Sequence, residues 1–212
     1  MNQIQVGITG HRDLRSEDLL NLSDRVREFF EKVERSNPGS DLILMSPLAD
    51  GADRLVAKLA IEVKWKVIAL LPMPVSEYEN DFETAESLTE FRELLEQVDR
   101  CVEIPLVEGN TLENIQGWGE NRAKQYVFVG AYTVRHSHIL LALWNGEDPK
   151  LPGGTAEVVQ FMRTGEIPAE FEPTTHPVPP TAGGSVYHIV TPRKSNPVTV
   201  GSAFEVKEYE SR

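Results

Sequence analysis

Short apolar segments alternate along the chain with segments of helical periodicity. Ile4, Val6 and Ile8 alternate with polar or small residues and predict a first strand, and a helix that ends at Asn37 follows. Further strands are expected near residues 42–45, 66–71, 101–104, 139–144 and 185–191, with helices in most of the intervals. Such alternation requires right-handed crossovers. We therefore predict an α/β fold with a doubly wound, mostly parallel sheet and helices on both faces.

Length and composition predict one domain followed by a tail. A chain of 212 residues fits a single core. We expect the domain over residues 1–192, including a proline-rich connection over residues 164–184, and a C-terminal tail or linker over residues 193–212. Residues 105–119 have little periodicity and are expected to form a functional loop that closes over a ligand. A downstream effector domain, in a longer polypeptide, is left open.

Charge narrows the classes of partner. The net charge of -12 comes from 33 acidic and 21 basic residues, which provide no broad basic stripe, so no nucleic acid is expected to bind. No apolar segment approaches the roughly 20 residues of a membrane-spanning helix, and we expect no membrane partner within this chain. The only cysteine, Cys101, is expected to be buried, and its inability to form an intrachain disulfide favours a cytoplasmic location. A homodimer is left open.

The turn after the first strand combines Thr9, Gly10, His11 and Arg12. Backbone N–H groups at a helix start favour anions, and a guanidinium adds a bidentate donor, so this turn is a candidate phosphate site. One glycine is far short of a dinucleotide-binding motif. The alternative is a tight turn in which the side chains are solvated or pair with Asp13.

The turn after the second strand contains Ser46, Asp50, Gly51 and Asp53. Gly51 permits close packing of a helix or a ligand. The two aspartates lie three residues apart near a helix N-terminus, where a carboxylate is stabilised and accepts ribose hydroxyls. The alternative role for one of them is helix capping.

The turn after the strand at residues 139–144 ends in Gly153, Gly154 and Thr155, which present successive N–H groups to a phosphate. The alternative is an ordinary glycine turn with Thr155 as the helix N-cap. Trp118 and Trp144 are candidates to stack on a base, and apolar packing is the alternative for Trp144. No metal site is predicted, because no acidic or cysteine ligands complete the histidines near Arg135.

Several of these motifs resemble the SLOG superfamily, which includes the DNA processing protein DprA and the LOG-type proteins. Residues 46–53 (Ser-Pro-Leu-Ala-Asp-Gly-Ala-Asp), followed by Ala57, resemble its strand-turn-helix signature, and residues 153–157 (Gly-Gly-Thr-Ala-Glu) resemble its second glycine motif. The opening residues 7–12, the segment around Pro72, residues 78–82 and Arg135 are also similar to the SLOG pattern. The resemblance covers about residues 4–163.

The resemblance implies a Rossmann-like domain that binds a nucleotide or nucleotide derivative as a sensor, with no required cofactor. A LOG-like nucleoside 5'-monophosphate phosphoribohydrolase is the alternative, with Glu157 and Arg135 as catalytic residues. Glu157 follows the threonine by two residues instead of three, which rotates it by about 100° around the helix and favours binding over catalysis. A third class is a structural or interaction domain without a ligand. The expected ligand-binding residues are Thr9, Gly10, His11, Arg12, Ser46, Asp50, Gly51, Asp53, Pro72, Gly153, Gly154 and Thr155.

Overall fold

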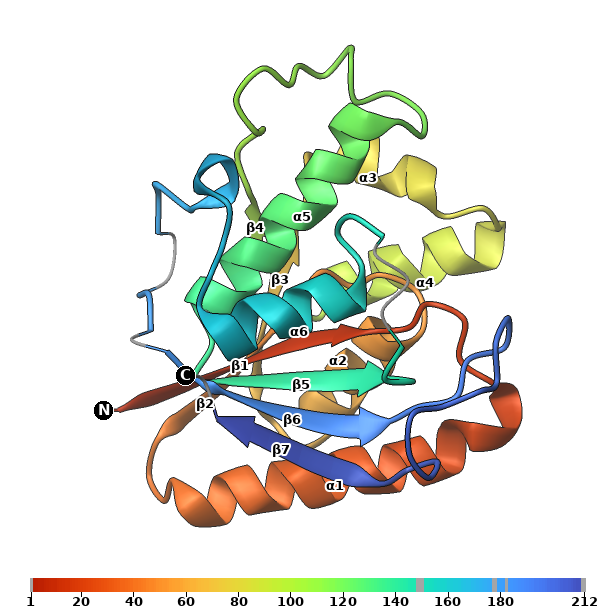
Figure 1. Cartoon of the computed structure of the whole chain (residues 1–212), viewed down its shortest axis with the longest axis vertical. Coiled ribbons are helices and arrows are strands. Elements are labelled where there is room, and N and C mark those ends of the chain that lie inside the picture. The colour runs from red at the N-terminus through yellow and green to blue at the C-terminus, as the bar shows by residue number, and fades with distance from the viewer. Residues whose placement is uncertain (1, 148–150, 177–178, 182, 211–212) are drawn as a thin grey trace.

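The computed structural model describes residues 2–147, 151–176, 179–181 and 183–210 (Figure 1). These residues form one seven-stranded sheet in the order β4-β3-β2-β1-β5-β6-β7. Its strands are β1 (Gln3–Gly10), β2 (Asp41–Ser46), β3 (Lys66–Leu71), β4 (Arg100–Glu103), β5 (Ile139–Trp144), β6 (Ser185–Val190) and β7 (Val206–Glu210). The first six strands are parallel, and β7 runs antiparallel to β6. This topology confirms the predicted doubly wound, mostly parallel α/β fold.

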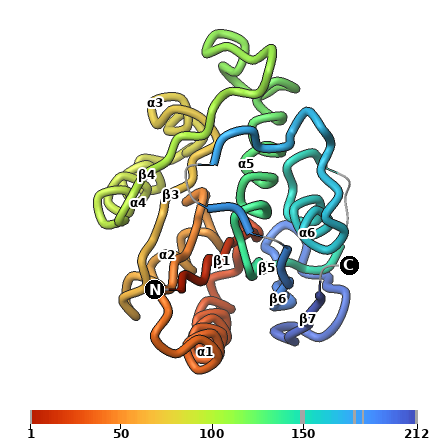
Figure 2. Tube along the Cα trace, turned by 90° about the vertical axis from the view of Figure 1, so that its left-hand side faces the viewer, coloured from red at the N-terminus to blue at the C-terminus, as the bar shows by residue number. Residues whose placement is uncertain are grey.

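Helices cover both faces of the sheet (Figures 1 and 2). One face packs against α1 (Leu19–Ser36), α2 (Ala52–Glu62) and α4 (Ala85–Leu95), and the other packs against α5 (Glu120–Arg135) and α6 (Thr155–Thr164). Shorter helical segments are α3 (Val75–Tyr78) and the 3-10 turns η1 (Ser16–Asp18), η2 (Glu79–Asp81) and η3 (Ala169–Phe171).

The continuous apolar sequence of β5 is explained by the helices that cover both faces of the sheet. Leu141 and Leu143 belong to the core beneath α1 and α2, whereas Leu140 and Ala142 belong to the core beneath α5 and α6. Because successive side chains of a strand point to opposite faces, a strand buried on both faces needs apolar residues at every position.

The C-terminal region differs from the expected tail. Residues 206–210 form β7 on the open edge of β6, and the chain before it docks on the β1 turn, where the backbone N–H of Lys194 donates to the carbonyl of Asp13 (2.7 Å). The sequence of β7 is short and half polar, so its pattern alone does not predict a strand. The strand forms because it pairs with β6. The sheet therefore extends past residue 192, the end of the expected domain.

Cys101 also differs from its expected burial. It lies on β4, the strand at the opposite edge of the sheet, and is exposed. An edge strand has one neighbour only, and the side chains of β4 are mostly outside the two cores.

The turns after β1 and β2 touch each other through their backbones. The N–H of Ala52, the first residue of α2, donates to the carbonyl of His11 (3.0 Å). Gly51 precedes it with φ +76°, and a Cβ there would lie 2.3 Å from the Arg12 carbonyl oxygen. A Cβ on Gly10 would lie 2.4 Å from the Cβ of Ala52. Two glycines therefore allow the start of α2 to approach the end of β1.

We expect Gly51→Ala to destabilise the protein far more than Gly39→Ala. Gly39 has nearly the same φ, +77°, and a Cβ added there would meet nothing within 4 Å, so its substitution costs only the backbone strain of about 1–2 kcal/mol. At Gly51 the contact with backbone carbonyls adds about 1–3 kcal/mol of overpacking. Urea unfolding of both variants measures the difference, and equal losses would contradict the contact.

Candidate ligand-binding site

A cavity of about 370 Å³ opens at the carboxyl ends of the central strands β1 and β5. Its wall is built from the turn after β1, the start of α2, Tyr78 of α3, one side of α5, the loop after β5 and the first turn of α6. Arg193 and Asn196 from the C-terminal segment complete it. The volume lies within the range of about 300–1,000 Å³ that is typical of small-molecule sites.

The cavity brings together eight of the twelve residues expected to bind a ligand. These residues are Thr9, Gly10, His11, Arg12, Asp53, Gly153, Gly154 and Thr155. They come from three crossover turns that are far apart in the sequence and meet because parallel strands present their carboxyl ends at one edge.

The other four expected residues do not line the cavity. The buried hydroxyl of Ser46 accepts the N–H of Leu48 (3.1 Å), which shapes the turn after β2. Gly51 contacts the β1 turn, as described above. The carbonyl of Pro72 accepts the side-chain amide of Gln125 (2.7 Å) and connects β3 to α5. These three residues have structural contacts instead of a place in the cavity lining.

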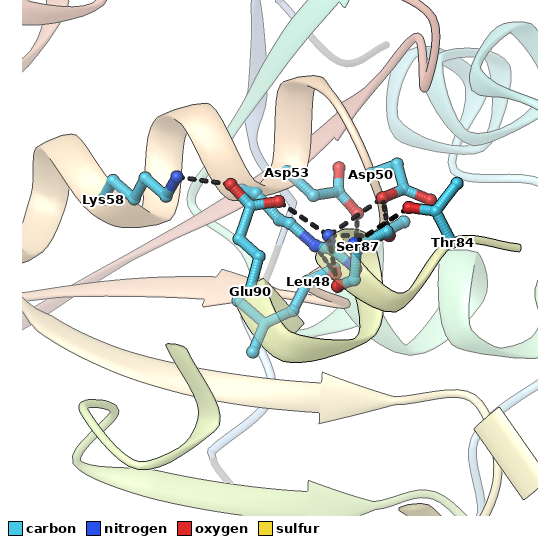
Figure 3. Close-up of polar contacts among 9 residues, drawn as sticks. Leu48, Asp50, Asp53, Lys58, Thr84, Ser87 and Glu90 are labelled. Carbon is cyan, nitrogen blue, oxygen red and sulfur yellow. Dashed lines mark hydrogen bonds and ion pairs between the residues drawn. The ribbon is translucent and has the colours of Figure 1, made fainter. Parts of the chain in front are cut away.

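Asp50, the fourth, faces α4 instead of the cavity (Figure 3). Its Oδ1 lies 2.9 Å from Nη1 of Arg54, whose side chain is only 2% exposed. The same nitrogen lies 2.7 Å from Oε2 of Glu90, and Nε of Arg54 donates to the carbonyl of Leu48 (3.0 Å). Asp50 therefore neutralises a buried arginine that joins α2 to α4.

We expect Arg54→Met to destabilise the protein by about 1.5–3 kcal/mol, because Asp50 and Glu90 lose their ion pairs with the buried guanidinium and the Leu48 carbonyl loses its donor. Lys58→Met is the matched control. Lys58 also pairs with Glu90, but its side chain is 49% exposed, and such a pair contributes at most about 1 kcal/mol. Urea unfolding measures both changes. Similar losses of unfolding free energy would show that Arg54 contributes no more to stability than the exposed Lys58.

Two arginines line the cavity, and one of them, Arg193, pairs with Asp13 (2.9 Å), whereas Arg12 is the cation without a carboxylate partner among the described residues. Among the described residues it forms no ion pair within 4 Å, and its Cζ lies 5.5 Å from the ring centre of Tyr126. Burial lowers the pKa of Arg12, but the nearby Tyr78, Tyr126, Asp81 and Asp53 outweigh it and raise the pKa. Arg12 therefore stays charged, and its charge is available to a ligand.

Asp53 and Tyr78 line the same cavity and are both buried. One carboxylate oxygen of Asp53 accepts the N–H of Ala49 (3.3 Å). Burial raises the pKa of Asp53 to about 7, although Arg12 opposes the change. The Tyr78 hydroxyl is fully buried and has no hydrogen-bond partner among the described residues. A hydroxyl left in this state costs free energy that a bound acceptor would recover.

The raised pKa of Asp53 predicts a pH-dependent stability difference between the wild type and Asp53→Asn. In the unfolded chain this carboxyl ionises near about pH 4, whereas in the folded protein it ionises near pH 7. Between these values the folded state holds an extra proton, so its stability falls as pH rises. Melting temperatures from pH 4.5 to 8 should show the variant gaining on the wild type up to pH 7. A constant Asp53→Asn difference over this range would contradict the shift.

His11 supports the site without charge. Its Nε2 accepts the backbone N–H of Asn145 (2.9 Å), which fixes the turn after β5. Burial and the neighbouring Arg193 lower the pKa of His11 to about 4, despite an opposing effect of Asp13. At neutral pH its ring is uncharged and offers no cation to a ligand.

Two backbone N–H groups of the glycine turn before α6 already bind acceptors within the chain. The N–H of Gly153 donates to Oε2 of Glu157 (2.6 Å), and the N–H of Gly154 donates to the carbonyl of Leu151 (3.1 Å). Gly153 has φ +69°, and a Cβ there would lie 2.5 Å from the Cβ of Tyr126. Gly154, not Thr155, is the N-cap of α6. Close packing on α5 is thus sufficient reason for Gly153.

Arg135 lies away from the cavity. Its Nε donates to Oε1 of Glu172 (2.6 Å), and its Nη2 donates to the carbonyl of Gly165 (3.1 Å). Gly165 is the C-cap of α6, whereas Glu157 is in the first turn of this helix. Ten helical residues span about 15 Å. The structure therefore does not bring together the expected catalytic pair of Glu157 and Arg135.

Tyr126 is one cavity residue that the sequence analysis missed. Its hydroxyl donates to Asp81, and Asp81 accepts from Nε of Arg122 (2.9 Å) in an ion pair whose two side chains are each 2% exposed. Tyr126 follows Arg122 by four residues, which places both side chains on one side of α5. This spacing was the signal in the sequence that the two residues share a neighbour. Tyr78 begins the segment 78–82 that resembles the SLOG pattern, but it was not among the expected ligand-binding residues. Arg193 and Asn196 were missed because their segment was expected to be a tail.

The loop of residues 105–119 is anchored and does not line the cavity. Nη1 of Arg122 donates to the carbonyl of Ile115 (2.8 Å), and the side chain of Ile115 is fully buried. The exposed ring of Trp118 stacks on Tyr126, with ring centres 6.2 Å apart. The loop thus supports the cavity wall from outside, which differs from the expected closure over a ligand.

Two kinds of feature are absent from the described residues. No group of three or more His, Cys, Asp or Glu side chains there is arranged to hold a metal ion. No helix in the described ranges is long and apolar enough to cross a membrane.

Comparisons with known proteins gave structural matches only. No protein-family model matches the chain, and a search of curated proteins found no match. The X-ray structure of TM1055, a structural genomics target, matches 75% of this chain and 70% of its own at 12% identity, with a TM-score of 0.41. DNA processing protein A from Helicobacter pylori, solved for its mode of single-stranded DNA binding, matches 76% of this chain and 61% of its own at 14% identity, with a TM-score of 0.42. Similarity this low transfers neither ligand nor activity, and the SLOG resemblance stays a prediction from the motifs.

Proposed function

We propose that this chain is a binding module for a small nucleotide or nucleotide derivative, and that the cavity at the ends of β1 and β5 is its site. The observation that carries the proposal is the presence of two unused polar groups in one cavity. Arg12 has no carboxylate partner among the described residues, and the buried hydroxyl of Tyr78 has no acceptor there. A cation and a buried donor of this kind are suited to an anionic ligand.

The walls of the cavity suit the remainder of such a ligand. Tyr126 and Trp144 provide aromatic surface, and Nε1 of Trp144 is fixed by the carbonyl of Glu147 (2.8 Å). Aromatic rings can stack on a base, and the carboxyl of Asp53, which lines the same cavity, can bond a ribose hydroxyl. Binding in this manner needs no cofactor. The net charge of -12 favours a small molecule over a nucleic acid as the partner.

We propose binding without turnover. A phosphoribohydrolase of the expected kind would use Glu157 and Arg135 together, but Glu157 is bonded to Gly153 and Arg135 is paired with Glu172 beyond the other end of α6.

Thermal shift assays with nucleosides, their 5'-monophosphates and diphosphates should identify ligands that raise the melting temperature. A ligand at one hundred times its Kd stabilises the folded state by about 2.7 kcal/mol. Chromatography of the same mixtures should show no free base. A single-stranded oligodeoxythymidine should cause no shift.

Three results would contradict the proposal in different ways. Release of base that is lost in Glu157→Gln would establish the hydrolase. A shift with the oligonucleotide alone would establish a nucleic-acid binder. No shift with any compound would favour the structural or interaction domain.

A further inference from the structure

The glycine turn before α6 already holds an anionic group. The carboxylate of Glu157 accepts the N–H of Gly153 at 2.6 Å, where a ligand phosphate on this turn would also need that donor. The adjacent N–H, of Gly154, is used by the Leu151 carbonyl. A phosphate that used these two donors would have to displace the charge-assisted hydrogen bond between Gly153 and Glu157, which disfavours their use by a ligand.

Two other polar groups of the cavity, the guanidinium of Arg12 and the hydroxyl of Tyr78, are not bonded in this way to groups of the residues that the structure describes. The guanidinium of Arg12 lies beside Tyr126 and forms no ion pair with any described residue. Tyr78 lies close enough for its electrostatic interaction with Arg12 to be appreciable, and its hydroxyl is fully buried without a partner among those residues. Both side chains line the cavity, although one comes from the β1 turn and the other from α3.

We infer that the phosphate group of the ligand binds between Arg12 and Tyr78, the arginine–tyrosine subsite, and not on the glycine turn. This inference rests on the proposed function and adds the position of the anionic group. Arg12 supplies the charge and a fork of donors that matches phosphate oxygens, and the Tyr78 hydroxyl donates to a third oxygen. The ligand thereby satisfies the buried hydroxyl that the free protein leaves unpaired.

Asp53 is compatible with an anion at this subsite. Its carboxyl lines the same cavity, and a charged carboxylate would repel a phosphate. Burial raises the pKa of Asp53 to about 7, so at neutral pH much of it is already protonated and able to donate a hydrogen bond. The groups near enough to act electrostatically on it are Arg12 from the β1 turn, Asp50 and Arg54 from its own turn and helix, and Tyr78 from α3.

The test uses AMP and adenosine as probes, which differ only in the phosphate. Isothermal titration gives the ratio of the adenosine Kd to the AMP Kd for the wild type and each variant. We expect Arg12→Gln to reduce this phosphate preference about tenfold or more, and Tyr78→Phe to reduce it about three- to tenfold. Ribose 5-phosphate shows whether the subsite also holds a phosphate without a base.

Two control variants separate this position from general charge effects. Arg15→Gln removes the same charge from the same segment, but Arg15 pairs with Glu17 and Asp18 outside the cavity, so the phosphate preference should be unchanged. Glu157→Gln should also leave it unchanged. If the phosphate lay on the glycine turn, removal of the competing carboxylate would increase the preference.

Stability gives an independent measure for Tyr78→Phe. Removal of a buried hydroxyl without a partner should preserve or raise the melting temperature of the free protein while it weakens AMP binding. A hydroxyl with a merely structural role would do the opposite.

The outcomes are distinguishable. If neither probe nor any compound of the nucleotide panel binds the wild type, both the function and the subsite are overturned. If AMP binds and its preference survives Arg12→Gln and Tyr78→Phe, or responds to Glu157→Gln, the function stands and the subsite is overturned.

Discussion

The hydrogen bond between the N–H of Ala52 and the carbonyl of His11 fixes the geometry on which the cavity depends. It joins the start of α2 to the turn after β1, and the N–H of His11 in turn donates to the carbonyl of Leu143 on β5 (3.0 Å). Three strands are thus connected at their carboxyl ends through one residue. Arg12 follows this residue directly, and Asp53 follows Ala52, so both side chains enter the cavity from a rigid base.

Three arginines near this base differ in how their charge is compensated. Arg54 has Asp50 and Glu90, and Arg122 has Asp81 together with the Ile115 carbonyl. Both are 2% exposed, as expected for charges that are buried only when paired. Arg12 has no such carboxylate among the described residues, although aspartates are near. Arg12 is therefore the exception among these three arginines, and it is also the one whose side chain is only partly buried.

The sequence predicted the sheet and the meeting of the turns, because these depend on local periodicity and on the general rule for parallel strands. It did not predict which of two aspartates enters the cavity. Asp50 lies just before α2 and Asp53 lies in its first turn. The choice between them depends on Arg54, which pairs with Asp50 and is itself held by Glu90 of α4, a contact that is distant in sequence. The pairing of β7 is equally non-local. Arg135 was misplaced because its motif does not show that the side chain binds Glu172 and the Gly165 carbonyl, which are distant in sequence.

The glycines of the motifs that resemble the SLOG pattern are explained by packing within the chain, without reference to a ligand. Gly10 and Gly51 permit the contact between β1 and α2, and Gly153 permits the approach of its turn to Tyr126. A glycine framework of this kind defines the crevice, and the side chains that protrude into it define the ligand. Chains that share these glycines and differ at Arg12 and Tyr78 would then form similar crevices lined by different polar groups.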